Sequence, residues 1–245
     1  MYFLYFLYLL YKMTNYVIIV SHHRYTQALN MVIESLHNVQ WPKSSTIIIY
    51  NDCSDMIHGD LPKRVVDSEL TKQGFIEFKT FANIYEYSGF FIPLAMNASV
   101  NDAFLLLHDT SLAYGDFKNL VEQAANEWRS KKIDILWGSP NGQSNLCIFG
   151  KNTSQKAWNM WSTWEKLDKI NAIHMEHMNN HPYSIQYSLK YNKDLKQEYS
   201  QVTQLYIGEE KIYTNNTRHK VVFPFVDISK FYVFIQESSQ HPQNP

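Results

Sequence analysis

Apolar residues in this chain form short unbroken runs that alternate with longer stretches of helical periodicity. Tyr16–Val20 and Thr46–Tyr50 are runs rich in β-branched residues, which predicts strands that are covered on both faces. Between them, Thr26–Asn38 carries apolar residues at the i, i+3, i+4, i+7 spacing of an amphipathic helix. This strand–helix–strand unit predicts two parallel strands joined by a right-handed crossover.

The alternation continues along the chain and indicates an α/β domain with a mixed sheet. Further strands are expected at Phe75–Phe78, Phe104–Leu107, Ile133–Trp137, Asn145–Phe149 (antiparallel to its neighbours), Gln204–Ile207 and Val221–Phe223. Further helices are expected at Ile92–Ser99, after caps at Asp116 and Ser154, and over Tyr183–Tyr199.

Composition narrows the class of protein. The chain has 245 residues and a net charge of -1, which fits one domain and gives no electrostatic footprint for nucleic acid. Its two cysteines, Cys53 and Cys147, form no CxxC, so neither a disulfide framework nor structural zinc is expected. A reducing compartment, the cytoplasm, is the expected location.

The two ends of the chain differ from the middle. Met1–Tyr11 is an apolar, Tyr-rich run that is shorter than the ~20 residues of a membrane-spanning helix. Three interpretations stay open: a short membrane anchor, an extra element packed on the domain, or residues added by an upstream start codon. Membrane association is expected only if residues 1–12 are translated and exposed. The domain is predicted over residues 13–236, with a disordered polar tail at 237–245.

Polar groups follow two of the predicted strands. Phe104–Leu107 ends in His108, Asp109 and Thr110, and Thr46–Tyr50 ends in the polar stretch 51–55, which contains Asp52 and Asp55. Because ligands of open α/β sheets bind at the carboxyl ends of the strands, chemistry is expected here.

These pieces also carry a resemblance. Ile48-Ile-Tyr-Asn-Asp-Cys-Ser-Asp55, Gly89, Ala95-Met-Asn97, Asp102 and Leu106-Leu-His-Asp-Thr110 follow one another in an order and spacing that resemble the GT-A glycosyltransferases, above all the large inverting family. The resemblance covers about residues 16–150. It implies a single GT-A-like domain with a Rossmann-like, mostly parallel mixed sheet flanked by helices. It also implies a hexosyltransferase that moves a sugar from a UDP- or GDP-sugar to a hydroxyl of a glycan or glycoprotein.

The resemblance implies roles for several residues on the donor side. Asp52, with Asp55 close by, would accept a hydrogen bond from the nucleobase, and Arg24 would contact the base or the diphosphate. A divalent Mn²⁺ or Mg²⁺ ion would neutralise the diphosphate. Where the family has two carboxylates flanking one residue, this chain has His108 and Thr110 around Asp109.

Three outcomes follow for the metal. His108 and Asp109 hold the ion together, or a register shifted by one makes Asp109 the principal catalytic ligand. The third outcome is an enzyme without a metal, or no enzyme at all. In the last case the chain would be a silent relative that binds a carbohydrate or a nucleotide.

Two later segments complete the predicted site. By resemblance, a late loop would close over the donor, with His219 at the metal and Arg218 and Lys220 at the diphosphate; a solvated hairpin is the alternative. An inverting transferase also needs a carboxylate base. Glu176 is the first candidate, with Asp168 and Glu165 behind it. The neighbouring histidines His174, His177 and His181 are otherwise surface or half-buried residues beside a helix boundary.

Overall fold

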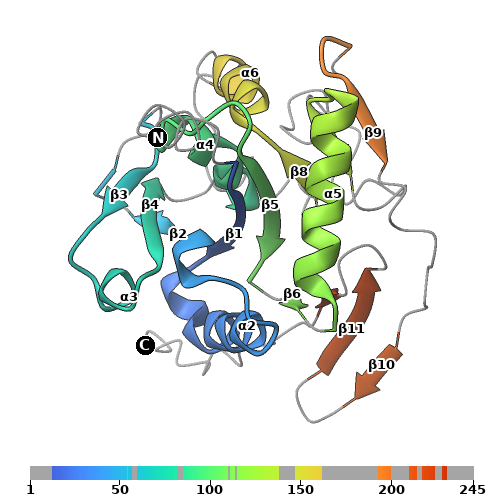
Figure 1. Cartoon of the computed structure of the whole chain (residues 1–245). Helices are drawn as coiled ribbons and strands as arrows, with labels where there is room; N and C mark the ends of the chain where they lie inside the picture. Colours follow the sequence, from blue (N-terminus) through green and yellow to red (C-terminus); the bar gives the residue numbers. More distant parts are fainter. Residues whose placement is uncertain are drawn as a thin grey trace, which may run out of the picture.

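A computed structural model of the chain describes residues 13–53, 55–56, 60–81, 85–109, 111–113, 115–137, 147–161, 193–199, 210–213, 217–223 and 228–230. Its main feature is an eight-stranded sheet in the order β3-β4-β2-β1-β5-β8-β7-β9 (Figure 1). The strands are β1 Asn15–Ser21, β2 Thr46–Cys53, β3 Lys63–Val65, β4 Ile76–Phe81, β5 Ala103–His108, β7 Ile135–Trp137, β8 Cys147–Phe149 and β9 Gln197–Tyr199.

The middle of this sheet is parallel. β4, β2, β1 and β5 all run in the same direction, whereas β3 and β8 run antiparallel to their neighbours. The antiparallel direction predicted for the strand at 147–149 is therefore correct. An α/β domain with a mostly parallel mixed sheet flanked by helices is confirmed.

Helices cover both faces of the sheet (Figure 1). Successive strand residues point to opposite faces, so Val17 and Ile19 of β1 pack with α2 and α5, while Ile18 and Val20 pack with η3, α4 and α6. The helices and 3₁₀ turns are η1 His23–Tyr25, α2 Thr26–Asn38, η2 Lys43–Ser45, α3 Glu69–Lys72, η3 Tyr85–Phe91, α4 Ile92–Ala95, α5 Phe117–Lys131 and α6 Lys151–Trp161. The predicted bounds of α2 are confirmed, because its apolar stripe is local and strong.

A second, four-stranded antiparallel sheet has the order β10-β11-β12-β6. Its strands are β6 Ser111–Ala113, β10 Glu210–Tyr213, β11 Thr217–Phe223 and β12 Ile228–Lys230. β6 follows β5 closely in the chain, so this sheet begins beside the carboxyl end of β5. Arg218, His219 and Lys220 pair with β10 as part of β11, so of the two interpretations of this segment the hairpin is correct and the loop is wrong.

Several predicted bounds need correction. The helix expected at Ile92–Ser99 ends at Ala95, where Asn97 takes a left-handed φ of 50°. The Asn97 and Ala98 N–H groups donate to Leu94 and Pro93, which is a Schellman ending.

Three further details of the helix predictions also differ. Ser154 lies inside α6 instead of capping it, and its hydroxyl accepts the Leu94 N–H at 3.1 Å. Residues 197–199 form strand β9 beside β7 instead of the end of a helix. Asp116 does occupy the N-cap position of α5, but its carboxylate accepts from the Asn119 side chain instead of a helix N–H. The strand expected at Gln204–Ile207 lies outside the described residues.

Among the described residues, none of the helices has the length and apolar character that a bilayer crossing requires.

Candidate functional site

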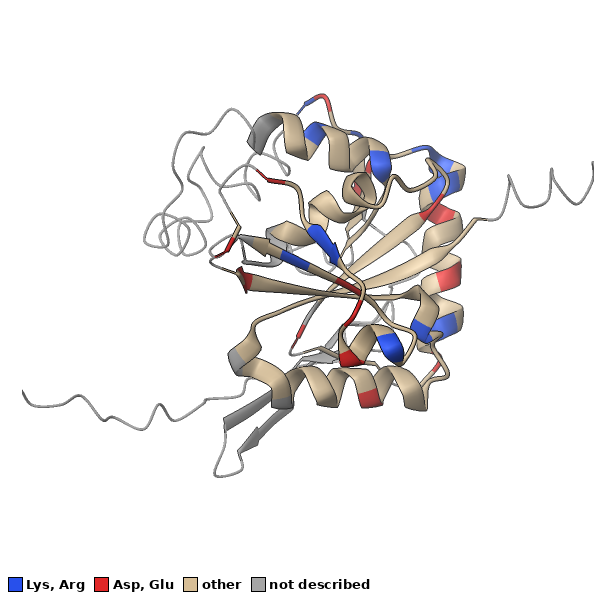
Figure 2. Ribbon diagram, turned by 90° about the vertical axis from the view of Figure 1, so that its left-hand side faces the viewer, with Lys and Arg blue, Asp and Glu red and all other residues tan. Residues whose placement is uncertain are grey.

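The order of the strands defines where a ligand would bind. From β1 the chain continues to β2, β3 and β4 on one side, then crosses to β5 on the other side of β1. In open α/β sheets, ligands bind outside the carboxyl ends of the strands at such a reversal. Ser21, Asp52 and Asp109 lie at this carboxyl edge, at the ends of β1, β2 and β5. In Figure 2, acidic segments lie near the left-hand ends of the strands.

Asp109 is a buried carboxylate at the carboxyl edge of the sheet. β5 pairs with β1 in parallel register up to Val20 and His108, so Ser21 and Asp109 come next to each other. The Ser21 hydroxyl donates to Asp109 Oδ2 at 3.0 Å, and both residues are at most 4% exposed. The contact orients a carboxylate that the sequence analysis named as a candidate metal ligand.

Asp52 forms a second cluster at the same edge. Its carboxylate accepts the His23 backbone N–H at 3.0 Å. It also contacts His23 Nδ1 at 2.5 Å and His22 Nδ1 at 3.1 Å. The strand was predicted to end at Tyr50, but β2 continues through Cys53, so Asp52 is a strand residue. The cluster therefore joins the end of β2 to the turn after β1.

The Asp52 cluster includes an aromatic surface. The His23 ring stacks on Tyr50 with the ring centroids 4.1 Å apart. Burial raises the pKa of the Tyr50 hydroxyl, and the charges of Glu77 and Asp52 raise it further, so this phenol stays neutral at physiological pH.

Asp55 is engaged elsewhere. It forms an ion pair with Lys79 of β4, and its side chain is 62% exposed. The hydrogen bond from Lys79 lowers the pKa of Asp55, and the same bond raises the pKa of Lys79. Asp55 thus has a cationic partner of its own, whereas the groups around Asp52 are imidazoles.

The remaining predicted residues are placed by their backbone or lie outside the described part. Arg24 is in η1, beside Asp52's partner His23, and His108 is the last residue of β5. Arg218, His219 and Lys220 lie in β11 of the small sheet. The base candidates Glu176, Asp168 and Glu165, together with Thr110 and the histidines at 174, 177 and 181, lie outside the described residues.

Sequence reasoning missed four residues of these two clusters. Ser21, His22 and His23 were not singled out as site residues. Cys53 was set aside because it lacks a CxxC partner. The available signal was positional: all four follow or end strands that lie side by side, so their side chains share an edge.

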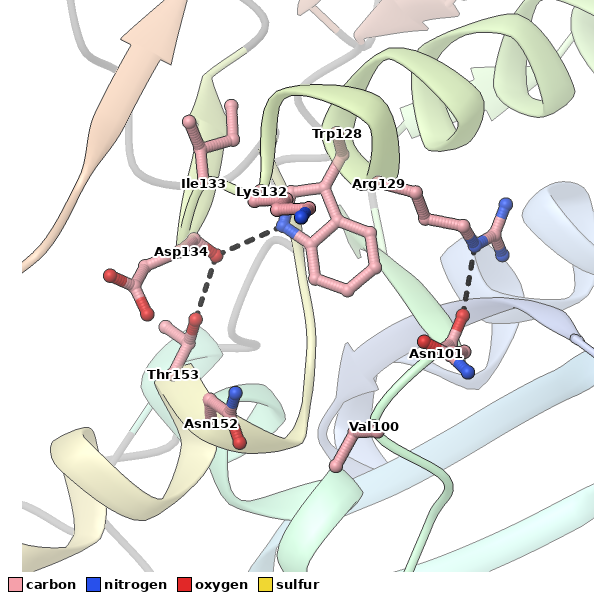
Figure 3. A pocket seen from close by; sticks show the side chains of 9 residues that line it. All are labelled: Val100, Asn101, Trp128, Arg129, Lys132, Ile133, Asp134, Asn152 and Thr153. Atoms are coloured by element: carbon pink, nitrogen blue, oxygen red, sulfur yellow. Dashed lines mark hydrogen bonds between the residues drawn. The ribbon is translucent and has the colours of Figure 1, made fainter.

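A pocket of about 350 Å³ lies at the opposite edge of the sheet, where β5 and β7 begin (Figure 3). There Trp128 Nε1 and Thr153 Oγ1 both donate to the Asp134 carbonyl, at 3.1 and 2.7 Å. Arg129 Nε donates to the Asn101 carbonyl at 2.8 Å. These polar groups hold backbone in place, and the pocket contains none of the predicted site residues.

Comparison with known proteins finds distant structural neighbours. No family model matches the chain, and no curated protein matches it. Among solved structures, the glycosyltransferase GlyE of Streptococcus pneumoniae TIGR4 is 12% identical with a TM-score of 0.41. That alignment covers 78% of this chain and 46% of GlyE. A putative glucose-1-phosphate thymidylyltransferase from Bacillus anthracis, in complex with a sucrose, is 10% identical with a TM-score of 0.41. Here the coverage is 76% of this chain and 86% of the other. Both likenesses are too coarse to transfer an activity or a residue assignment.

Proposed function

We propose that this chain is a glycosyltransferase that uses a nucleotide-sugar donor. The observation that carries the proposal is that Asp52 and Asp109 lie at the same edge of the sheet, on the strands that flank β1. One carboxylate would recognise the nucleobase and the other would serve the diphosphate. A nucleoside diphosphate is long enough to reach across β1 from one carboxylate to the other. It has a polar nucleobase at one end and the diphosphate at the other.

On the nucleobase side, the Asp52 carboxylate would accept an N–H of uracil or guanine. The stacked pair of His23 and Tyr50 would supply an aromatic face for the base. Arg24 is the cation proposed for the diphosphate, since it belongs to the same η1 turn. Arg218 and Lys220 of β11 are the proposed second source of positive charge.

On the diphosphate side, the available side chains carry atoms that divalent cations commonly bind. A buried carboxylate oxygen suits Mg²⁺ or Mn²⁺, and imidazole suits Mn²⁺ as well. Asp109, oriented by Ser21, would be the principal ligand, with His108 and His219 as further candidates. Such an ion would neutralise the negative charge that develops on the leaving diphosphate.

The reaction would be a direct displacement. A carboxylate base, for which Glu176 is the candidate, takes the proton of an acceptor hydroxyl. The hydroxyl oxygen then bonds to the anomeric carbon while the bond from that carbon to the diphosphate oxygen breaks. The nucleoside diphosphate leaves with the electron pair, and the anomeric configuration is inverted. The acceptor would be a hydroxyl of a glycan or a glycoprotein.

Release of UDP or GDP from a panel of UDP- and GDP-hexoses, measured with and without Mn²⁺ or Mg²⁺, tests this proposal. We expect turnover with at least one donor and its loss in Asp109→Asn. Thermal shifts with UDP and GDP run in parallel, because ligand at ~100 Kd stabilises a folded protein by ~2.7 kcal/mol.

A silent nucleotide- or carbohydrate-binding protein is the second candidate, favoured by the single carboxylate between His108 and Thr110. It predicts stabilisation by a nucleotide without turnover of any donor. If no donor turns over and no nucleotide stabilises the chain, both candidates are wrong.

A further inference from the structure

A group of metal-binding side chains lies at the end of β2. One ligand atom each of His23, Asp52 and Cys53 lies within 4.8 Å of the other two. Consecutive residues of a regular strand point to opposite faces, but the pairing of β2 with β4 shifts register between Tyr50 and Cys53. This irregularity explains how Asp52 and Cys53 can both approach His23.

We propose that His23, Asp52 and Cys53 bind a borderline divalent cation of the zinc type, with His22 as the fourth ligand. Thiolate, imidazole and carboxylate together are the donors that Zn²⁺ uses, whereas Mg²⁺ prefers oxygen ligands only. The site differs in this respect from the oxygen-based one proposed at Asp109. His22 Nδ1 lies 3.1 Å from Asp52, but His22 is not among the three residues whose ligand atoms are mutually close, so it would have to move towards His23 and Cys53 to complete the site.

The spacing of the ligand atoms allows a tetrahedral ion after small movements. Bonds of about 2.0–2.3 Å place the ligands of one zinc ion roughly 3.3–3.8 Å apart. The Nδ1–Oδ1 contact between His23 and Asp52 is shorter, 2.5 Å, so the ion would replace this hydrogen bond. The His23 side chain is 61% exposed and has room to turn. Asp52 keeps the backbone N–H of His23, which orients its carboxylate.

The charges around the three ligands are unequal. Asp52 supplies a carboxylate beside His23, whereas the carboxylate of Asp55 is already paired with Lys79. A bound ion would take Cys53 as its thiolate. Cation binding must therefore release the thiol proton, so the affinity should increase with pH.

This inference does not depend on the transferase proposal, but it has a consequence for it. Asp52 cannot hold a zinc-type ion and a nucleobase in the same place at once. Zinc and nucleotide should therefore compete, while Mn²⁺ or Mg²⁺ at Asp109 should not compete with either.

Titration of the full chain with Co²⁺, the spectroscopic substitute for zinc, tests the site. We expect visible bands typical of tetrahedral cobalt and a near-ultraviolet thiolate-to-cobalt charge-transfer band, saturating at about one equivalent. Zn²⁺ should abolish both. Cys53→Ser should remove the charge-transfer band, and His23→Gln should weaken Co²⁺ binding at least ~10-fold.

The chain offers a matched control, since Cys147 is its only other cysteine. Cys147 lies buried in β8, and Cys147→Ala should leave the charge-transfer band in place. A Co²⁺ titration without that band, or a band that survives in Cys53→Ser, overturns the proposal. Circular dichroism of each variant shows that the fold is retained. The cobalt titration contains no nucleotide, so its outcome does not depend on transferase activity. A failed titration overturns the metal site, and a failed transferase assay overturns the proposed function.

Discussion

The two edges of the large sheet both carry buried polar side chains, but these side chains have different partners. At the amino-terminal edge they bond to backbone: Asp102 accepts the N–H groups of Thr14 and Ser99, at 2.9 and 3.0 Å. At the carboxyl edge they also bond to one another, as Ser21 does with Asp109. Side chains that accept hydrogen bonds from backbone N–H groups stabilise the fold. Side chains that bond to one another hold reactive groups together in one site.

The pocket strengthens this contrast. It lies at the amino-terminal edge, where its polar lining residues Trp128, Arg129 and Thr153 donate to carbonyl groups (Figure 3). A search guided by this pocket would select the amino-terminal edge. A search guided by titratable and metal-binding side chains selects the other one, and the reversal of strand order beside β1 supports that choice.

The strongest test of the contrast compares the buried carboxylates of the two edges. Asp109→Asn should lower transfer activity by about 10²–10³-fold, the cost typical of a lost charge-stabilising group, with little loss of stability. Asp102→Asn should leave the activity of the folded protein unchanged but lower the free energy of unfolding by about 1–3 kcal/mol, because backbone N–H groups lose an acceptor. Steady-state kinetics and urea unfolding measure the two effects. Equal effects of both substitutions on activity would remove the distinction between the edges.

The next largest effect concerns packing at the amino-terminal edge. A Cβ on Gly150 would lie 2.6 Å from the Trp128 ring, and Trp128 donates to the Asp134 carbonyl. Gly150→Ala should therefore lower the free energy of unfolding by about 1–3 kcal/mol in urea titrations. Its control is Gly74→Ala, where the nearest atom is 4.0 Å away and only the φ of 96° opposes the side chain. That change should cost about 1 kcal/mol, because a Cβ in the left-handed region crowds the following carbonyl oxygen. A smaller loss for Gly150→Ala than for Gly74→Ala would show that Trp128 moves aside easily.

Local patterns predicted the first unit of the fold well. The positions of α2 and of the strands before and after it were predicted from the spacing of nearby apolar residues. The location of Asp52 and Asp109 at the ends of strands was predicted because each follows an apolar run. Patterns failed where a distant segment decided the structure. The β2 strand continues to Cys53 because β4 pairs with it, and 197–199 is a strand because β7 lies beside it.

The composition of the site depends on distant segments even more. Ser21 and Asp109 are 88 residues apart, and His23 and Asp52 are 29 apart. Their contacts are set by the register of β1 with β5 and β2, which no local pattern contains. The same holds for Asp55, whose partner Lys79 could not be chosen from sequence among the many surface lysines.

A smaller effect is expected at the nucleobase end of the carboxyl edge. Asp52→Asn should weaken UDP or GDP binding by roughly 10-fold, since a hydrogen bond to a charged acceptor contributes about 1.5–3 kcal/mol and the amide retains part of it. Isothermal titration calorimetry measures the affinity. Asp60→Asn is the matched control, because Asp60 is a carboxylate whose partner is Lys63. Unchanged affinity in Asp52→Asn would place the nucleobase elsewhere.

The smallest effect separates the two cysteines and tests the charge of the carboxyl edge. Burial and the carboxylates of Asp52 and Asp55 raise the pKa of Cys53, so its alkylation at about pH 8 should be slower than that of a free thiol. Because the folded-state pKa is the higher one, the folded protein keeps this proton longer, and stability should fall as pH rises above about 8.5. Cys53→Ser should remove that part of the pH dependence.

Asp52→Asn should speed the alkylation of Cys53, while Cys147, whose pKa is raised by complete burial, should react only after unfolding. Iodoacetamide labelling followed by mass spectrometry resolves the two sites. An Asp52→Asn variant with unchanged Cys53 reactivity would mean that the charge of Asp52 does not change the pKa of Cys53. The negative charge of Asp52 would then also be too weak to attract a cation to this edge.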